Sequence, residues 1–151
     1  MRFLSALLLT ATLFVACSPP PARPAANGIT RITYETTSGG RLGGYSRLAI
    51  TADSTTYVEG TRGTRKATRA KTAKATWDAL LKAINLSSFR QLKSQPSQLP
   101  VDGTDVTLTI TQGKETISRT NSEEDVAHYK AIQPWVKLLD AQLTQAAAKA
   151  K

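Results

Sequence analysis

The sequence predicts an α+β fold, with a single antiparallel sheet of four to six strands and two helices packed on one face. Short runs in which apolar and polar residues alternate indicate half-buried strands. Two longer segments repeat apolar residues at helical spacing. The strands come before and between these helices, an order that favours helices gathered on one side of an antiparallel sheet. With 151 residues, 40% of them hydrophobic, the chain has material for one core.

The first half of the domain is expected to consist mainly of strands. Four strands are predicted before the first helix: residues 29–36, 45–52, 55–59 and 64–71. In the first of them, Ile32 and Tyr34 face one side while Arg31 and Glu35 face the other, which is the period of a strand. The fourth strand is so polar that we expect it at an edge of the sheet or with an exposed face.

The first helix should be amphipathic and follow the fourth strand, because apolar residues recur there at the spacing i, i+3, i+4 and i+7. The residues of this stripe are Trp77, Leu80, Leu81 and Ile84. Thr72 or Thr76 is expected to cap the helix, since a hydroxyl oxygen can accept from its free amides. Phe89 and Leu92 predict one further short turn onto the core.

The second half is expected to hold a hairpin and a C-terminal helix. Residues 105–111 and 114–120 form the hairpin, joined at Gln112-Gly113. The last helix should start at Ser122, where a hydroxyl and three acids suit the positive end of a helix. Pro134 lacks an amide hydrogen, so we expect a break there, with Pro134 in the first turn of the second piece. Residues 148–151 should form a frayed tail.

Residues 1–16 have the composition of a secretory leader, with a basic start followed by uncharged, mostly apolar residues. The uncharged part, residues 3–16, is shorter than the roughly 20 residues of a membrane-spanning helix. Residues 18–28 contain four prolines and predict a stiff tether. The folded domain is therefore expected over residues 29–147.

The segment LFVAC, residues 13–17, resembles the lipobox of bacterial lipoproteins, with Phe14 where that family usually has leucine. The resemblance implies that Cys17 receives a diacylglyceryl group, that the leader is cut before it, and that the new amino group is acylated. Ser18 is not the aspartate that marks retention at the inner membrane, which implies export to the outer membrane. By this resemblance, the mature protein is anchored in the bacterial cell envelope through the lipid on Cys17.

Residues for catalysis and metal binding are scarce, with one cysteine and one histidine in the chain. A structural zinc site needs about four such ligands, and acylation of Cys17 removes its thiolate. No nucleophile can be nominated beside His128. Asp102 and Asp105 lack the further acids of a calcium loop. We therefore expect no catalytic residues, no metal and no other cofactor.

A basic segment, residues 62–74, carries six cations and no acid within a chain of net charge +9. The candidate anion-binding residues are Arg62, Arg65, Lys66, Arg69, Lys71 and Lys74. If residues 64–71 form a strand, Arg65, Arg69 and Lys71 project from one face and Lys66 from the other. Such a row favours phosphates or acidic sugars, or it is simply a solvated edge strand. Because no aromatic residues are interleaved for base stacking, nucleic acid is not an expected partner.

The loop SGGRLGG, residues 38–44, holds four glycines, which permit positive φ and close backbone approach. It lacks the Lys-Ser/Thr ending of a phosphate-binding loop. It is either a hairpin connection or an exposed loop that enters a partner's cleft with Arg41 and Leu42 at its tip. The candidate partner-binding residues are Ser38, Gly39, Gly40, Arg41, Leu42 and Gly43.

Residues 30–143 resemble emfourin-like small inhibitors of thermolysin-type metallopeptidases. The resemblance rests on Tyr34, Ser38, Gly39, Gly40, Gly43, the Leu80-Leu81 helix, Phe89, the strand of residues 106–110, and Pro134-Trp135. It implies a similar fold and, through the loop at residues 38–44, protease inhibition.

Two functions thus remain open. One is a non-enzymatic envelope lipoprotein that binds a protein or an anionic polymer, and the other is the protease inhibitor. In either case the membrane is contacted through the lipid.

Overall fold

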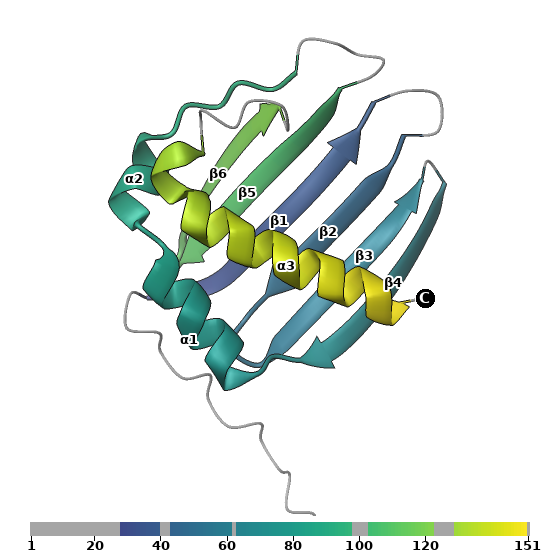
Figure 1. Ribbon diagram of the computed structural model, residues 1–151, viewed down its shortest axis with the longest axis horizontal. Coiled ribbons are helices and arrows are strands. Elements are labelled where there is room, and N and C mark those ends of the chain that lie inside the picture. The colour runs from purple at the N-terminus through teal and green to yellow at the C-terminus, as the bar shows by residue number, and fades with distance from the viewer. Residues whose placement is uncertain (1–27, 40–42, 62, 98–102, 123–128, 151) are drawn as a thin grey trace, which may run out of the picture.

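The computed structural model describes residues 28–39, 43–61, 63–97, 103–122 and 129–150. These residues form a six-stranded antiparallel sheet and a layer of helices (Figure 1), which confirms the predicted α+β fold. The elements are β1 (Ile29–Ser38), β2 (Tyr45–Ile50), β3 (Ser54–Thr61), β4 (Thr64–Lys71), α1 (Lys74–Ala83), α2 (Leu86–Gln91), β5 (Thr104–Gln112), β6 (Glu115–Ser122), the 3-10 turn η1 (Lys130–Ile132) and α3 (Gln133–Ala150).

The strand order is β4-β3-β2-β1-β5-β6, so β1 lies inside the sheet and β4 and β6 form its edges. Tyr34 of β1 lies opposite Leu48 of β2 on one side and Leu108 of β5 on the other. This register gathers the apolar residues of the strands on one face. The expectation that the polar fourth strand lies at an edge is confirmed.

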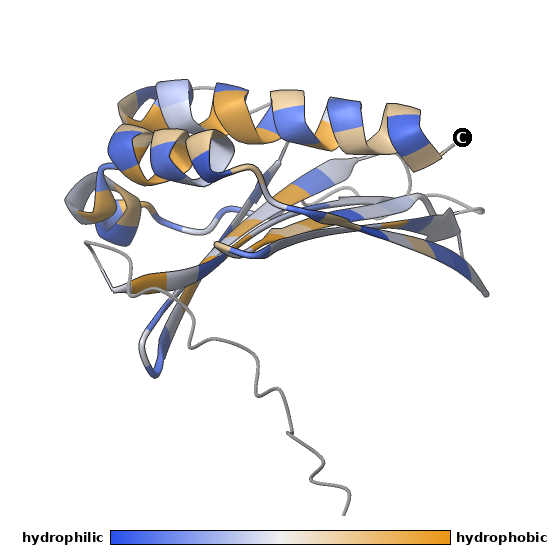
Figure 2. Cartoon of the chain, turned by 90° about the horizontal axis from the view of Figure 1, so that it is seen from below, coloured by the Kyte–Doolittle hydropathy of each residue, from blue (hydrophilic) through white to orange (hydrophobic). Residues whose placement is uncertain are grey.

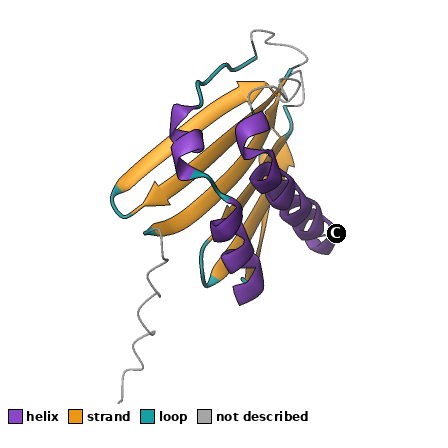
Figure 3. Ribbon diagram, turned by 60° about the vertical axis from the view of Figure 1, so that its left-hand side comes forward, coloured by secondary structure: helices purple, strands orange, loops and turns teal. Residues whose placement is uncertain are grey.

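The helices all lie on that apolar face, as Figures 2 and 3 show, and the opposite face carries none of the described helices. Trp135 and Leu139 of α3 are fully buried, and Trp77 and Leu80 of α1 are buried nearly as completely. Phe89 of α2 is also fully buried. Apolar area removed from water in this single layer is the main stabilising contribution to the fold.

Helix α1 begins after Ala73 without a side-chain cap, so the prediction of a cap from Thr72 or Thr76 was wrong. The Thr72 hydroxyl instead makes a hydrogen bond with the Thr55 hydroxyl, 2.9 Å away on β3. Thr55, which is distant in the sequence, thus binds the hydroxyl that the capping preference of threonine would assign to the start of the helix. The short turn expected around Phe89 is α2, which is capped by Asn85 through a bond from the Ser88 amide to Oδ1, 3.0 Å.

The C-terminal region is described from Tyr129 onward. Ser122 is the last residue of β6, and residues 123–125, the acids expected in the first turn of the last helix, lie outside the described residues. The expected break at Pro134 is confirmed, because η1 ends before it and Pro134 lies in the first turn of α3. The expected frayed tail is wrong for the described part, since α3 continues to a buried Ala150 whose carbonyl accepts a hydrogen bond from Lys66 Nζ of β4.

The edge of β6 is partly covered by the segment that follows α2. Gln95 donates from its amide to the Thr120 carbonyl at 2.9 Å and accepts from the Ser122 amide at 3.1 Å. Asn121, which is fully buried, adds an Oδ1 acceptor 2.7 Å from the same Gln95 amide. No hydrogen bond among the described residues covers the outer edge of β4 in this way. None of the described helices is long and apolar enough to cross a membrane.

Candidate anion-binding face

The face of the sheet without helices, called here the open face, carries the basic residues of β4. Strand alternation puts Arg65, Arg69 and Lys71 on this face, opposite Gly60, Thr56 and Ser54 of β3. The sequence prediction that these three cations share one side is confirmed. All three are exposed, and the β3 residues beside them are uncharged.

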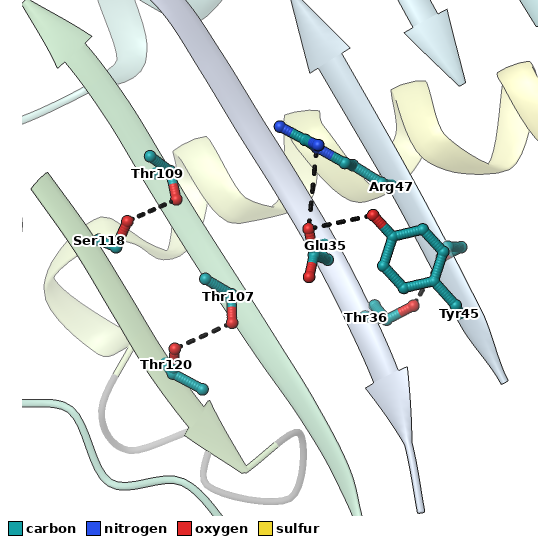
Figure 4. Close-up of polar contacts among 9 residues, drawn as sticks. Glu35, Thr36, Tyr45, Arg47, Thr107, Thr109, Ser118 and Thr120 are labelled. Atoms are coloured by element: carbon teal, nitrogen blue, oxygen red, sulfur yellow. Dashed lines mark hydrogen bonds and ion pairs between the residues drawn. The ribbon is translucent and has the colours of Figure 1, made fainter. Parts of the chain in front are cut away.

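A second polar group of the open face joins β1, β2 and β4, and Figure 4 shows its members Glu35, Tyr45 and Arg47. The Tyr45 hydroxyl donates to the Glu35 carboxylate at 3.3 Å, and Arg47 Nε lies 3.7 Å from the same carboxylate. The Arg65 guanidinium lies 4.7 Å from the centroid of the Tyr45 ring, within reach of a cation–π attraction. Glu35 is therefore paired within the face, while Arg65 keeps its donors at the surface.

Rows of hydroxyl groups fill the β5–β6 side of the open face. Thr107 and Thr120 are 2.9 Å apart, and Thr109 and Ser118 are 2.8 Å apart, in the directly opposed pairs shown in Figure 4. Cross-strand hydroxyl pairs of this kind stabilise the sheet modestly. Each pair uses only one of its two protons, so the row still presents donors and acceptors outward.

The remaining candidate cations are not part of this face. Lys66 lies on the opposite side of β4, as predicted, and its ammonium group bonds the end of α3. Lys74 forms an ion pair with Asp78, one helical turn further along α1. Arg62 lies outside the described residues. Of the six residues of the basic segment, the structure therefore brings three together on the open face.

The candidate partner-binding loop connects β1 to β2, its antiparallel neighbour, which confirms a hairpin connection. Its base is fixed by the Ser38 amide donating to the Gly44 carbonyl at 2.9 Å and by the Gly39 amide donating to the Gly103 carbonyl at 2.8 Å. Gly43 takes a φ of 43°, a conformation that favours glycine. Residues 40–42, which include the expected tip, lie outside the described residues, so entry into a partner's cleft stays a prediction.

A shallow depression of about 640 Å³ occupies the corner of the helix-bearing face that α3 leaves uncovered. Within it, the Tyr57 hydroxyl donates to Glu59 at 2.8 Å, and Thr36 and Ser46 share a hydrogen bond of 2.6 Å. Burial, followed by the hydrogen bond and the charge of Glu59, raises the pKa of Tyr57 to about 12. The phenol therefore remains a neutral donor throughout the physiological pH range.

The described residues contain no group of three or more histidine, cysteine or carboxylate side chains that could hold a metal ion. Cys17, His128 and Asp102 lie outside them. Asp105 accepts a hydrogen bond from the Ser97 amide at 2.7 Å, so this carboxylate orders the loop before β5.

No protein-family model matches the sequence, and no curated protein matches it either. Only part of the open face was predicted from the sequence. Tyr45, Arg47 and Glu35 were not among the candidate residues, although alternation around Leu48 would have placed Tyr45 and Arg47 on the polar side of the second strand. These residues lie close to Arg65 only because strands β1 to β4 pair side by side in the sheet.

Proposed function

We propose that this domain is a non-enzymatic binding module that holds an anionic polymer of the bacterial cell envelope against the open face of its sheet. The observation that carries the proposal is the position of Arg65, Arg69 and Lys71 on one exposed side of β4. Residues two apart on one side of a strand are about 7 Å from each other. Arg69 and Lys71 therefore lie about 7 Å apart, and Arg65 lies about twice that distance from Arg69, in a flat row that suits an extended chain carrying repeated charges.

The charge balance of the open face supports an anionic partner. By strand register its cations are Arg31, Arg47, Arg65, Arg69 and Lys71, and its acids are Glu35 and Asp105. Glu35 is already paired, with Arg47 and Tyr45, and Asp105 lies on β5, which is separated from β4 by three intervening strands. The potential near β4 is therefore positive. The hydroxyl rows of β5 and β6 add groups that can bond the hydroxyls of a sugar chain.

A column of immobilised polygalacturonate, which carries one carboxylate on each sugar, tests this proposal. The full-length protein in a nonionic detergent should be retained at low salt and eluted by a salt gradient, since exposed charge contacts are screened. The triple variant R65E/R69E/K71E should elute at much lower salt. Its matched control is K82E/K130E/K137E, which changes the net charge equally but on the helix side. If the two triple variants elute together, retention reflects net charge alone and the proposed face is wrong.

The envelope location is the second part of the proposal and depends on Cys17. A lipid chain contributes about 0.8 kcal/mol for each buried methylene, and two or three chains make the anchor durable. The variant C17S should keep its leader and run at the larger size of the uncleaved protein. If C17S still fractionates with membranes at the size of the mature protein, the lipid anchor is not what holds it there.

Inhibition of thermolysin-type metallopeptidases is the second candidate function. The observation that favours it is the fixed base of the loop between β1 and β2, where Ser38 and Gly39 are held by Gly44 and Gly103. A fixed base lowers the entropy lost when a loop enters a cleft. Titration of thermolysin with the same full-length protein tests this candidate function. If the proteolytic activity of thermolysin is unchanged at micromolar concentrations of the protein, the candidate is rejected.

A further inference from the structure

The two edges of the sheet differ in how far the rest of the chain covers them. At β6, the segment after α2 bonds the edge through Gln95. At β4, no hydrogen bond among the described residues does so, and Figure 1 shows no described strand beyond it. In an antiparallel pair only alternate residues bond the neighbouring strand. About half of the amides and carbonyls of β4 are therefore directed away from the sheet.

The backbone of β4 is regular enough to accept another strand. All eight of its residues pair with β3 without a register shift, and none of them is proline. A bulge or a proline would interrupt the row of outward amides and carbonyls. Seven of the eight residues are exposed. The feature of β4 that limits which strand can pair with it is therefore its charge.

The charge of β4 selects against a second copy and in favour of an acidic strand. Its cations are Arg65, Lys66, Arg69 and Lys71, and it carries no acid. Two β4 strands paired with each other would bring these cations together, which is unfavourable. A glutamate or aspartate across the pair would be favourable for the same reason. Among the described residues no ion pair occupies Arg69 or Lys71, so both can pair with an acid of the partner.

The two sides of β4 differ in what they offer to the side chains of an added strand. Arg69 and Lys71 lie on the open face, whereas Thr68 and Ala70 lie on the helix side. On the helix side, Thr68 and Ala70 help to line a groove of about 480 Å³ between β4, the start of α1 and the last turns of α3. The side chains around this groove are mostly threonine, alanine and glutamine. Because directly opposed residues have Cβ atoms about 5 Å apart, an added strand that alternates acids with small polar residues fits both sides.

We propose that the edge of β4 binds an extended acidic segment of a partner protein as a seventh strand of the sheet. Backbone hydrogen bonds to β4 hold the segment, and alternate acids beside Arg69 and Lys71 select it. The inference goes beyond the proposed function, because it adds a protein partner and the backbone edge of the sheet. The two surfaces share the cations of β4, so the decisive measurement is one that separates backbone pairing from attraction to charge.

Amide hydrogen exchange of the full-length protein in nonionic detergent, followed by NMR, makes that separation. The probe is an eight-residue peptide of alternating threonine and glutamate, blocked at both ends and as long as β4. The peptide should slow exchange at alternate amides of β4, because its carbonyls accept from the amides that face outward. Peptide binding without slower exchange anywhere in β4 would overturn the proposal, as would no binding at about millimolar peptide.

Two N-methylated forms of the peptide are matched controls, one methylated on every threonine nitrogen and the other on every glutamate nitrogen. Both keep all the acids, but each lacks the amide hydrogens of one edge, because the amides of alternate residues point to opposite edges of a strand. We expect one form to bind within about threefold of the parent peptide and the other to lose at least about tenfold in affinity. Equal affinity of the two forms would reject the seventh strand.

The requirement for acids is tested by a peptide in which glutamine replaces every glutamate. At low salt it should bind at least about tenfold more weakly than the glutamate peptide. On the protein side, R69E/K71E should weaken binding of the glutamate peptide by at least about tenfold, and its matched control K82E/K137E by less than about twofold. Equal affinity for the two peptides, or equal losses in the two variants, would mean that the edge does not select acids.

The polygalacturonate column separates this inference from the proposed function. Polygalacturonate on the open face should leave exchange in β4 unchanged, because it contacts side chains and not the backbone edge. Column retention that is lost in R65E/R69E/K71E, without slower exchange in β4 when the peptide is added, would reject the edge and keep the open face. Slower exchange in β4 with the peptide, together with column retention that is insensitive to that triple variant, would keep the edge and reject the open face.

Discussion

The ring of Phe89 in α2 meets the ring of Trp135 in α3 edge to face, with centroids 5.7 Å apart and planes inclined by 73°. Both side chains are fully buried. The pair joins the short second helix to the long third one beneath the same face of the sheet. Because α2 has only six residues, its position depends on this contact and on the Asn85 cap more than on its own helical bonds.

A double-mutant cycle of F89L and W135L should measure this contact directly. Aromatic pairs in this geometry contribute about 0.5–1.5 kcal/mol beyond the area they bury. We expect a coupling energy of that size in urea unfolding, with each single variant destabilised by more than the coupling. Single-variant effects that simply add would show that the rings contribute only buried area.

The pKa of Tyr57 gives a second prediction. Burial and Glu59 raise this pKa to about 12 from its usual 10.0, so the folded state favours the neutral phenol. The stability contributed by Tyr57 is therefore fully present below pH 10 and is lost as the pH rises toward 12. Absorbance of the tyrosinate in the folded protein should include a late transition from Tyr57, and in E59Q that transition should move to lower pH. An unchanged transition in E59Q would leave burial as the only cause.

Among Gly28, Gly44, Gly60, Gly63 and Gly113, replacement of Gly60 should cost most through close contact. A Cβ atom at this position would lie 2.0 Å from the Thr64 carbonyl oxygen, so the β3–β4 hairpin would have to shift. We expect G60A to destabilise the protein by on the order of 2 kcal/mol. At Gly44 the nearest atoms, in Ser38, are 3.6 Å away, and G44A should change stability by less than about 1 kcal/mol. Equal thermal shifts for G60A and G44A would contradict this reading of the hairpin.

Asn121 should hold the covering segment on the edge of β6. Its Oδ1 accepts the Gln95 amide at 2.7 Å inside a fully buried site, and removing one partner of such a bond costs about 1–3 kcal/mol. We expect N121A to be destabilised by that amount and to exchange the amide hydrogens of Gln95 and Ser122 faster. Exchange that is unchanged at these two amides would mean that the backbone bonds alone hold the segment.

The strands could be predicted from the sequence because their signals are local. The alternation of Val106, Leu108 and Ile110 with threonines predicted β5 almost to its ends. The turn at Gly63 and the polarity of the residues after it predicted that β4 lies at the edge of the sheet. Pro134 marked the start of α3 because a proline fits only the first turn of a helix. Each of these rules depends on neighbours in the chain.

The features that could not be predicted depend on residues far apart in the sequence. Thr72 bonds Thr55 instead of capping α1, and Lys66 holds Ala150, 84 positions away. The alanine-rich tail was expected to fray, yet α3 continues to Ala150, which is buried and accepts a hydrogen bond from Lys66 of β4.

The entry point of the chain has a consequence for how a tethered molecule is oriented. The Gly113 amide donates to the Gly28 carbonyl at 3.1 Å, so the polypeptide reaches β1 beside the β5–β6 turn. The opposite end of β1 is about 30 Å further along, at the usual rise of a strand. A domain suspended from its N-terminus would turn the β5–β6 turn toward the bilayer. The far ends of β1 and β3 would then point outward, and the row formed by Arg65, Arg69 and Lys71 on β4 would run parallel to the membrane normal.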